Sequence, residues 1–361
     1  MDEHTHEGIG SEGGLSPVPD SIAAILKQHG ADRPIRNPDE VAGLVKQLRK
    51  VMVPHERFRE GILRLRTIHA GLDRSPAAEA GVMTFLGRSG SGKSNTLRYY
   101  ARQYPARKGE SGWIRPVVYV RVPPEANKAA LLRSILSEMG LPVTNARDTD
   151  ILMRDVLHHL REQKVELLIL DEMQHLIDQR TQRFQYISAD ILKDLLSSNC
   201  CQMVFAGLDS AIMALEVNPQ LNRRSPLRFP MTEYNWFDEE DQGNYVDFLT
   251  AVADQMPFQR RPAVDDVDVA ERLHRSSDGL IGITMNLVAK GMEYALFEGA
   301  ATVTLEHLAV GFDELKRRGI KINPFRGKCP DTLGVPVDYI YEEDSGLSKR
   351  KERPVRASFS K

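Results

Sequence analysis

The stretch FLGRSGSGKSNTLRYY at residues 85–100 places glycines and serines around one lysine, between an apolar run and a helix-forming run. The spacing matches the pattern G-x-x-x-x-G-K-[ST] of phosphate-binding loops. The backbone N–H groups of such a loop hold phosphate oxygens, and the helix N-terminus that follows adds partial positive charge. Lys93 would reach the β- and γ-phosphates as a catalytic residue, and the Ser94 hydroxyl would ligate Mg²⁺. The residues expected to contact the nucleotide are Gly87, Arg88, Ser89, Gly90, Ser91, Gly92, Lys93, Ser94 and Asn95.

The segments on both sides of this loop decide how the pattern is interpreted. GVMTFLG before the loop predicts a buried strand, and SNTLRYYARQY after it has helical spacing without an internal proline or glycine. A chance glycine-serine turn is the alternative, and it would not require a strand before it and a helix after it.

Two adjacent acidic residues follow a second apolar run in the stretch VELLILDEMQHLID at residues 165–178. Open α/β sheets bind ligands at the carboxyl ends of their strands, so we expect Asp171 to hold Mg²⁺ directly or through water. Glu172 would act as the catalytic general base that polarises an attacking water. Such a pair favours hydrolysis of a nucleoside triphosphate, and without a guanine-reading N-K-x-D motif downstream ATP is favoured. A solvated acidic pair after a core strand is the alternative.

A third apolar run, QMVFAGL, ends where additional-strand ATPases carry a polar residue that senses the γ-phosphate. Leu208 cannot do this, so Asp209 or Ser210 would have to act as the sensor. A strand-to-helix turn with an Asp or Ser cap explains the same two residues about as well.

Two arginines precede the last predicted strand in the stretch NPQLNRRSPLRF. Arg223 or Arg224 would reach the γ-phosphate of a neighbouring subunit and stabilise transition-state charge there. A solvated basic turn is the competing interpretation. Further along, where many such ATPases use an arginine to touch the phosphates, Gly282 is followed by Ile283 and Thr284. We therefore expect slow hydrolysis, or a nucleotide that mainly holds an assembly together.

Strand-like and helix-like segments alternate through residues 81–234, which predicts an α/β fold. The sheet is expected to be mostly parallel and covered by helices on both faces. After Trp236 the strand signal disappears, and helical patterns alone predict a small all-helical subdomain. The five expected strands are 82–86, 116–121, 166–170, 202–206 and 227–231.

Changes of composition divide the chain into five expected segments. Both ends are rich in glycine, proline or charge and lack an apolar pattern, so we expect them to be extended or disordered. The segments are a disordered arm at 1–20, N-terminal helices at 21–80, the P-loop ATPase α/β core at 81–234, a helical lid at 235–322 and the tail at 323–361.

The composition is ordinary for a globular protein, since 41% of the 361 residues are hydrophobic and 27% are charged. No run of about 18 apolar residues exists, so no membrane span is expected. The N-terminus lacks the apolar segment of a secretory signal, and three cysteines form no metal or disulfide framework. We therefore expect a cytoplasmic protein. The net charge of −2 argues against tight DNA binding by an isolated monomer, but not against a basic patch repeated in an oligomer.

This series of motifs resembles the TniB/TnsC family, the AAA+ ATPases that regulate bacterial DNA transposition. The resemblance rests on VPHERFREGILRL, GRSGSGKSNTLRYYAR, LLILDEMQHLID, VFAGLDSAIMAL followed by NPQLNRR, and GLIGITMNLVAKGMEYAL. It implies an additional-strand AAA+ fold, ATP and Mg²⁺ as cofactors, and a homo-oligomeric ring or filament on double-stranded DNA. It also implies a target-selector protein and a DDE-type transposase as partners. Nothing in the chain resembles a transposase core, so strand transfer would belong to that partner, and Leu208 departs from the family's usual pattern.

Basic residues gather in the segment that follows the phosphate-loop helix. A ring or filament would align one such patch per subunit along a DNA backbone, so that weak contacts are summed. Such binding would ignore base sequence and weaken with salt. A solvated helix face and loop is the alternative. The candidate DNA-binding residues are Arg98, Arg102, Lys108, Arg115, Arg121 and Lys128.

Two other functions fit the same ATPase motifs. A replication helicase loader or initiator ATPase would share the core, but no helix-turn-helix that would favour it is evident in the sequence. A nucleotide-dependent scaffold or switch would bind protein only, and charge reversal at Arg102, Arg115 and Arg121 would not affect it.

Overall fold

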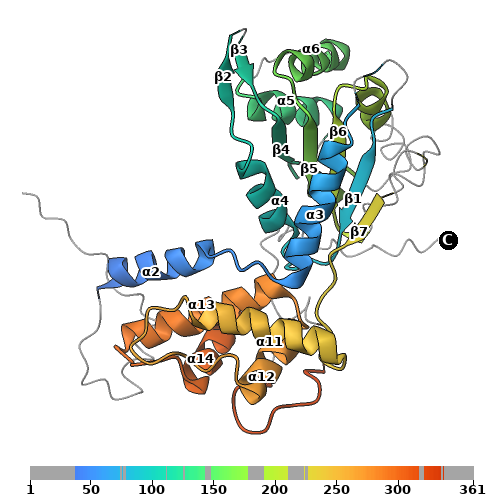
Figure 1. Ribbon diagram of the computed structural model, residues 1–361. Coiled ribbons are helices and arrows are strands. Elements are labelled where there is room, and N and C mark those ends of the chain that lie inside the picture. Colours follow the sequence, from blue (N-terminus) through green and yellow to red (C-terminus); the bar gives the residue numbers. More distant parts are fainter. Residues whose placement is uncertain are drawn as a thin grey trace, which may run out of the picture.

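The computed structural model consists of two bodies, which Figure 1 shows one above the other. A parallel sheet with helices on both faces forms the upper body, and a bundle of helices forms the lower body. The structure describes residues 37–73, 75, 79–110, 112–124, 127–142, 148–177, 191–209, 223, 227–316, 321–334 and 336.

Five parallel strands form the sheet in the order β4-β5-β6-β1-β7. This confirms the predicted fold class, and β6 is the additional strand between β1 and β5. Pro116 lies just outside β4 because it has no N–H to donate to a neighbouring strand, although its carbonyl accepts from the Leu167 N–H at 3.0 Å. The strands are β1 (Val82–Leu86), β4 (Val117–Arg121), β5 (Leu167–Asp171), β6 (Gln202–Gly207) and β7 (Leu227–Pro230).

Helices cover both faces of the sheet because the central strands are buried on both sides. Leu65 and Leu97 bring α3 and α4 onto one face. Leu132 and Leu152 bring α5 and α6 onto the other face. The helices of this body include α3 (Glu56–Ala70), α4 (Lys93–Arg102), α5 (Lys128–Glu138), α6 (Thr149–Glu162) and the short α7 (Gln174–Ile177), and residues 191–197 are also helical.

An antiparallel hairpin that we did not predict connects α4 to β4. Its strands, β2 (Arg107–Gly109) and β3 (Gly112–Ile114), are three residues long, too short to show an alternating pattern in the sequence. Trp113 on β3 is 53% exposed. The hairpin therefore carries basic and aromatic side chains at the outer edge of the sheet.

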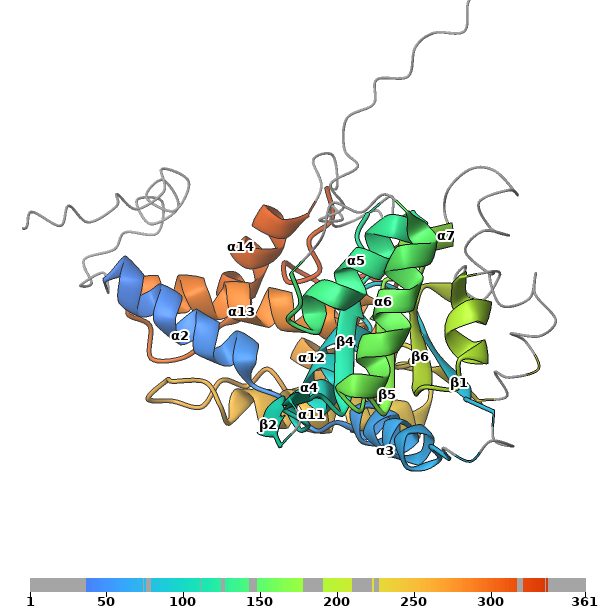
Figure 2. The same ribbon diagram turned by 90° about the horizontal axis from the view of Figure 1, so that it is seen from above.

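The helical bundle contains α2 as well as the described helices that follow the sheet. Figures 1 and 2 show α2 beside α13, and Val41 and Leu48 of α2 are buried in one core with Leu287 and Phe312. The N-terminal helices thus divide between the two bodies, and the boundaries proposed for the domains stay a prediction. No described helix, here or around the sheet, is long and apolar enough to cross a membrane. The bundle helices are α2 (Pro38–Lys50), α11 (Glu239–Ala253), α12 (Val267–Ser277), α13 (Ile281–Phe297) and α14 (Leu305–Leu315).

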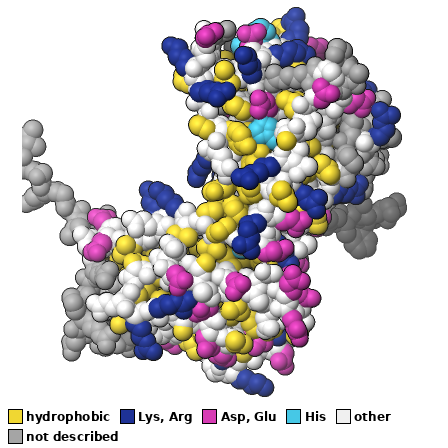
Figure 3. All heavy atoms as spheres, viewed as in Figure 1, with side chains coloured by type: hydrophobic (Ala, Val, Ile, Leu, Met, Phe, Trp, Pro, Cys, Tyr) yellow, Lys and Arg dark blue, Asp and Glu magenta, His cyan; other side chains and the backbone are white. Residues whose placement is uncertain are grey.

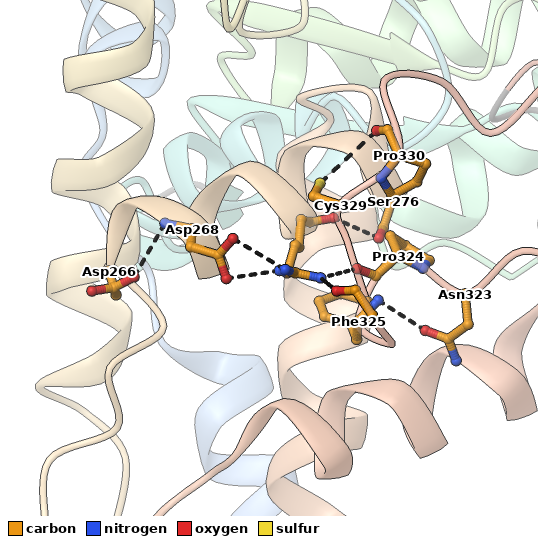
Figure 4. Close-up of polar contacts among 10 residues, drawn as sticks. Asp266, Asp268, Ser276, Asn323, Pro324, Phe325, Cys329 and Pro330 are labelled. Carbon is orange, nitrogen blue, oxygen red and sulfur yellow. Dashed lines mark hydrogen bonds and ion pairs between the residues drawn. The ribbon is translucent and has the colours of Figure 1, made fainter.

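A segment at 321–334 returns to the bundle, and Figure 4 shows Pro324 and Phe325 of this segment near Asp268 and Ser276 of α12. The Arg272 guanidinium donates to the carbonyl oxygens of Pro324 at 2.7 Å and Gly327 at 3.0 Å. It also donates to both carboxylate oxygens of Asp268, at 2.8 and 3.1 Å. The first part of the region that we expected to be an extended tail is therefore packed against the bundle.

Candidate nucleotide-binding site

The phosphate-binding loop connects β1 to α4 at the carboxyl edge of the sheet. Gly92 is the N-cap of α4 and has a φ of +98°, which glycine adopts without steric cost. At Gly87 a side chain is excluded by space, because a Cβ would lie 2.3 Å from the carbonyl oxygen of Met231. These two glycines let the loop turn tightly, and the N–H groups at the start of the helix stay available for an anion.

Lys93 is enclosed by the loop that precedes it, and only 8% of the residue is exposed. Its Nζ donates to the carbonyl oxygens of Gly87 and Arg88, both at 2.7 Å, and to Ser91 Oγ at 3.3 Å. The ammonium group is therefore fixed at the centre of the loop, where the motif requires it to meet phosphate.

Acidic residues lie at the same edge of the sheet as this lysine. Burial lowers the pKa of Lys93, and the nearby charges of Asp171, Glu172 and Asp209 oppose that shift. Lys93 follows β1 and Asp171 ends β5, and these parallel strands have their carboxyl ends at one edge of the sheet, with β6 between them. The structure thus brings the loop lysine and the predicted acidic pair to one site.

The remaining loop residues take different positions. Ser94 is half-buried next to Lys93, at the second residue of α4. The Arg88 guanidinium pairs with Asp278 and, at 3.5 Å, with Glu233, so its side chain joins the loop to the bundle. Ser91 and Gly87 are buried, Gly90 and Gly92 are half-buried, and Ser89 and Asn95 are exposed.

Asp171 is the last residue of β5 and is 1% exposed. Its Oδ2 accepts a hydrogen bond of 2.6 Å from the Tyr119 hydroxyl, and its Oδ1 accepts one of 2.9 Å from the Glu172 N–H. The Tyr119 hydroxyl accepts in turn from Arg98 Nε at 3.2 Å. A buried carboxylate is costly without such donors or a cation, so this arrangement holds Asp171 at a fixed position beside the loop. The roles of Tyr119 and Arg98 at this site were missed in the sequence.

Glu172 has a φ of +62°, an uncommon backbone conformation for a residue with a side chain. Such conformations cost about 1–3 kcal/mol and cluster at functional sites. The carboxylate accepts a hydrogen bond from Gln174 Nε2 and lies 3.6 Å from Arg121 Nη2. The side chain remains 25% exposed, so water can reach it. Its position next to Asp171 suits the role of a general base.

Gln174 connects the ends of β5 and β6 and was also missed in the sequence. Its amide nitrogen donates to Glu172, and its amide oxygen accepts from the Leu208 N–H at 3.3 Å. Gln174 is buried, with 8% of its surface exposed. The carboxamide therefore supplies a polar group at the end of β6, where the side chain of Leu208 supplies none. A glutamine two residues after Glu172 was the available signal.

One of the two predicted sensor residues can be placed. Asp209 is exposed just after β6 and is among the charges that act on the pKa of Lys93. Ser210 lies outside the described residues. A sensing role for either residue stays a prediction.

The ligand atoms available here fit Mg²⁺. The Ser94 hydroxyl and the Asp171 carboxylate are both oxygen ligands, and Mg²⁺ typically combines one or two carboxylates with waters and substrate phosphates. In the part of the chain that the structure describes, no cluster of three or more His, Cys, Asp or Glu residues could hold a metal ion. This donor set suits a metal ion that arrives with the nucleotide.

Arg223 lies far from the phosphate loop of its own chain. It is 78% exposed and pairs at 3.4 Å with Glu79, just before β1. The loop follows the other end of that strand, about 17 Å away for five extended residues. Arg223 therefore cannot complete the site of its own subunit and could serve only that of a neighbour. Arg224 lies outside the described residues.

Three candidate DNA-binding residues lie together. Arg98, Arg102 and Arg115 line a cavity of about 330 Å³ beside β4. Lys108 is exposed on β2 of the neighbouring hairpin. These four residues occupy one side of the sheet edge.

The other two candidates are engaged elsewhere. Arg121 is the last residue of β4, where it pairs with Glu172 at the nucleotide site. Lys128 at the start of α5 lies 4.0 Å from Asp194. The six residues therefore do not form a single continuous patch in one subunit.

The phosphate loop also contacts the helical bundle. The N–H of Gly282, near the start of α13, donates to the carbonyl oxygen of Gly90 at 2.7 Å. A Cβ on Gly282 would lie 2.8 Å from that oxygen, so the close approach requires glycine. Beside this junction a cavity of about 600 Å³ is lined by Arg57, Tyr234 and Asp278 among others. A nucleotide in the loop would therefore lie next to both bodies.

His55 forms a second link between the two bodies. Its Nδ1 hydrogen-bonds the Tyr234 hydroxyl at 3.0 Å and accepts from the Phe58 N–H at 3.4 Å. Burial, assisted by the charges of Arg57 and Arg59, lowers the pKa of His55 to about 4. The imidazole is therefore neutral in the folded protein at physiological pH.

Acidification is expected to weaken this link. In the unfolded chain His55 is protonated below pH about 6.5, whereas in the folded protein it is protonated only near pH 4. The contribution of His55 to the free energy of unfolding is therefore fully present above pH 6.5 and is lost as the pH falls below that value. Between pH 7 and 4.5 the wild type should lose about 2 kcal/mol more unfolding free energy than His55→Asn, which keeps a capping side chain. Urea denaturation at both pH values measures this, with His158→Asn on the exposed face of α6 as control. Equal losses in all three proteins would contradict the assignment.

Comparisons with known proteins bear on the family and the fold of this chain. The family described as "Bacterial TniB protein" matches residues 46–233, more than half of the chain. No curated protein matches the sequence.

Solved structures show the same fold at low sequence identity. The Pyrobaculum aerophilum Cdc6p structure has a TM-score of 0.55 at 17% identity, over 71% of this chain and 66% of that one. The Aeropyrum pernix ORC1 protein in complex with DNA has a TM-score of 0.54 at 18% identity, over 73% and 66%. The Aeropyrum pernix ORC2 protein with ADPNP and ADP has a TM-score of 0.52 at 17% identity, over 76% of this chain and 71% of that one. The chain thus spans just under two thirds of the length of the first two.

The family match confirms the resemblance seen in the motifs, and the structural neighbours have the AAA+ architecture of this sheet and bundle. The chain belongs to the TniB family of bacterial proteins and has the fold of an AAA+ ATPase.

Proposed function

We propose that this protein is an ATPase that assembles with ATP on double-stranded DNA and links target-site selection to a DDE-type transposase. The observation that carries the proposal is that the Lys93 loop follows β1 and that Asp171 and Glu172 lie at the end of β5, at one edge of the parallel sheet. Family membership supports the transposition role, and the expected partners are a target-selector protein and the transposase.

Each residue of the site would have a separate role in ATP hydrolysis. Lys93 and the loop N–H groups would bind the phosphates and neutralise their charge. Ser94 and Asp171 would hold Mg²⁺, which would supply positive charge that stabilises the negative charge developing during hydrolysis. Glu172 would accept a proton from the attacking water. Gln174 and Arg121 contact the Glu172 carboxylate and would orient it.

An oligomer is supported by the position of Arg223. Because Arg223 is exposed and too far from its own loop, it could reach a γ-phosphate only in a neighbouring subunit. Shared sites of this kind make ATP binding and subunit assembly interdependent. ATP would thus favour the ring or filament, and hydrolysis would release it.

DNA binding is supported by the arginines beside β4 and by the exposed Lys108. The Aeropyrum pernix ORC1 structure of the same fold contains DNA, so the architecture is compatible with such a ligand. Contacts to the backbone would be independent of base sequence and would be summed over the subunits of an assembly.

Negative-stain microscopy of the protein with double-stranded DNA tests this function. We expect DNA-coating rings or filaments with a non-hydrolysable ATP analogue and none without nucleotide. The double variant Arg102→Glu/Arg115→Glu should lose the coating, because it reverses charge where phosphate contacts are expected. Arg154→Glu on the exposed face of α6 is the matched control.

The outcomes separate the alternatives. Dispersed monomers under every condition would contradict the proposal. Assemblies that form equally well without DNA and tolerate the double charge reversal would favour a protein-only scaffold or switch. Strand separation of the duplex, without any effect on transposase recruitment, would favour a replication initiator or loader.

A further inference from the structure

A groove lined by arginines follows the outer edge of the sheet, between the end of α4 and the edge strand β4. Arg98, Arg102 and Arg115 supply its positive charge, and the cavity measures about 330 Å³. Glu138 is the one carboxylate among its described lining residues. The groove is therefore suited to an anionic ligand.

The hairpin extends this basic surface. Arg107 and Lys108 on β2 are exposed, and Trp113 lies beside Arg115, whose guanidinium carbon is 5.6 Å from the ring centroid. Figure 3 shows Lys and Arg side chains on this upper part of the molecule. Several cations spread along a groove and a hairpin match a chain of regularly spaced phosphates better than one small anion. A nucleic-acid backbone is the ligand with this charge distribution.

Two hydrogen bonds lead from the groove to the nucleotide site. Arg98 Nε donates to the Tyr119 hydroxyl at 3.2 Å, and this hydroxyl donates to Asp171 Oδ2 at 2.6 Å. Arg98 and Tyr119 both line the groove, whereas Asp171 is buried at the end of the neighbouring strand.

We propose that phosphates of a DNA backbone bind in this groove and that Arg98 and Tyr119 couple their binding to the Mg²⁺-holding carboxylate of Asp171. The proposal rests on the proposed function, because it takes Asp171 as a metal-holding residue. A phosphate that pairs with the Arg98 guanidinium would hold Arg98 Nε in the position that donates to the Tyr119 hydroxyl. The Tyr119 hydroxyl would in turn be held in the position that donates to Asp171 Oδ2. Tyr119 is thus a positioning residue between two ligands.

Coupling of this kind is reciprocal, because both ligands belong to one thermodynamic cycle. DNA must raise the affinity for Mg²⁺·ATP by the same factor by which Mg²⁺·ATP raises the affinity for DNA. Couplings between sites typically amount to about 5- to 150-fold. We expect a factor of about 10 in the wild type, at the low end of this range, because only two hydrogen bonds carry it.

The test measures both affinities for one subunit at a time. A double-stranded oligonucleotide too short for two subunits removes the cooperativity that neighbours would add. Fluorescence anisotropy gives its affinity with and without Mg²⁺ and a non-hydrolysable ATP analogue. Calorimetry gives the affinity for the analogue with and without the duplex, and the two ratios should agree.

Tyr119→Phe should reduce the coupling factor from about 10 to below about 2, because it keeps the ring and removes the hydroxyl. Arg98→Lys should do the same, since it keeps the charge in the groove but loses the Nε–H that reaches Tyr119. Arg154→Lys on the exposed face of α6, outside the groove, is the matched control and should keep the full factor. Thermal unfolding of each variant identifies any that fail to fold. If Tyr119→Phe or Arg98→Lys does not fold, the other variant still tests the coupling.

The outcomes distinguish this proposal from the proposed function. If the wild type, Tyr119→Phe and Arg98→Lys all bind Mg²⁺·ATP and the duplex with the same coupling factor, the coupling does not run through Arg98 and Tyr119. The proposed function would remain intact in that case. A wild type that binds neither ligand overturns both. Inorganic phosphate that raises the affinity for the analogue as much as the duplex does would make the groove a site for free anions and overturn its assignment to DNA.

Discussion

Replacing Lys93 with alanine is expected to weaken ATP binding by at least about 100-fold, because hydrogen bonds to charged groups contribute about 1.5–3 kcal/mol each. The ammonium group is enclosed by the loop, with carbonyl partners at 2.7 Å, so no other cation can take its place. Isothermal titration calorimetry with ATP and Mg²⁺ measures this loss. Assembly on DNA should disappear together with the nucleotide.

The matched control is Lys46→Ala on the exposed face of α2, which removes the same charge far from the loop. It should bind ATP as the wild type does. If Lys93→Ala retained ATP with unchanged affinity while its thermal unfolding matched that of the wild type, the assignment of the loop would be wrong.

Glu172→Gln is expected to slow ATP hydrolysis by about 10²- to 10⁴-fold, the usual contribution of a general base. Glutamine has nearly the same shape and keeps a hydrogen-bond acceptor, but it cannot take a proton from water. The affinity for ATP should change little, because Lys93 and Asp171 are intact. Phosphate release under saturating ATP measures the rate, and assemblies on DNA should persist with ATP as they do with a non-hydrolysable analogue.

Glu162→Gln on the exposed end of α6 serves as the control for this change of charge. Hydrolysis at the wild-type rate in Glu172→Gln would show that Glu172 is not the general base. Loss of ATP binding in the same variant would show instead that the carboxylate is needed to shape the site.

The phosphate loop and the acidic pair were predictable from the sequence because their chemistry is encoded in short, local spacings. A glycine at position 92 is required by the backbone itself, and the apolar runs around it specify strands whose observed ends differ from the predicted ones by at most one residue. The parallel order of the sheet follows from the alternation of strands and helices. Local patterns therefore determined most of the core.

Contacts between distant segments could not be predicted in the same way. Tyr119 meets Asp171 only because β4 and β5 are neighbours, and Arg88 meets Asp278 only because the bundle lies against the loop. The hairpin was missed because three-residue strands carry no period. The packing partner of α2 could not be predicted either, because an amphipathic pattern shows which face of a helix is buried but not which element covers it.

The place of α2 in the bundle has a mechanical consequence. Within the described residues, the chain crosses between the two bodies twice, at residues 51–55 and again at 231–238. His55 and Tyr234, one on each crossing, are bonded to each other, so the two tethers are held together at this point. Two tethers joined in this way restrict the rotation of one body against the other more than a single tether would. A displacement of the phosphate loop that reaches the bundle through Gly90 and Gly282 would therefore act on both tethers at once.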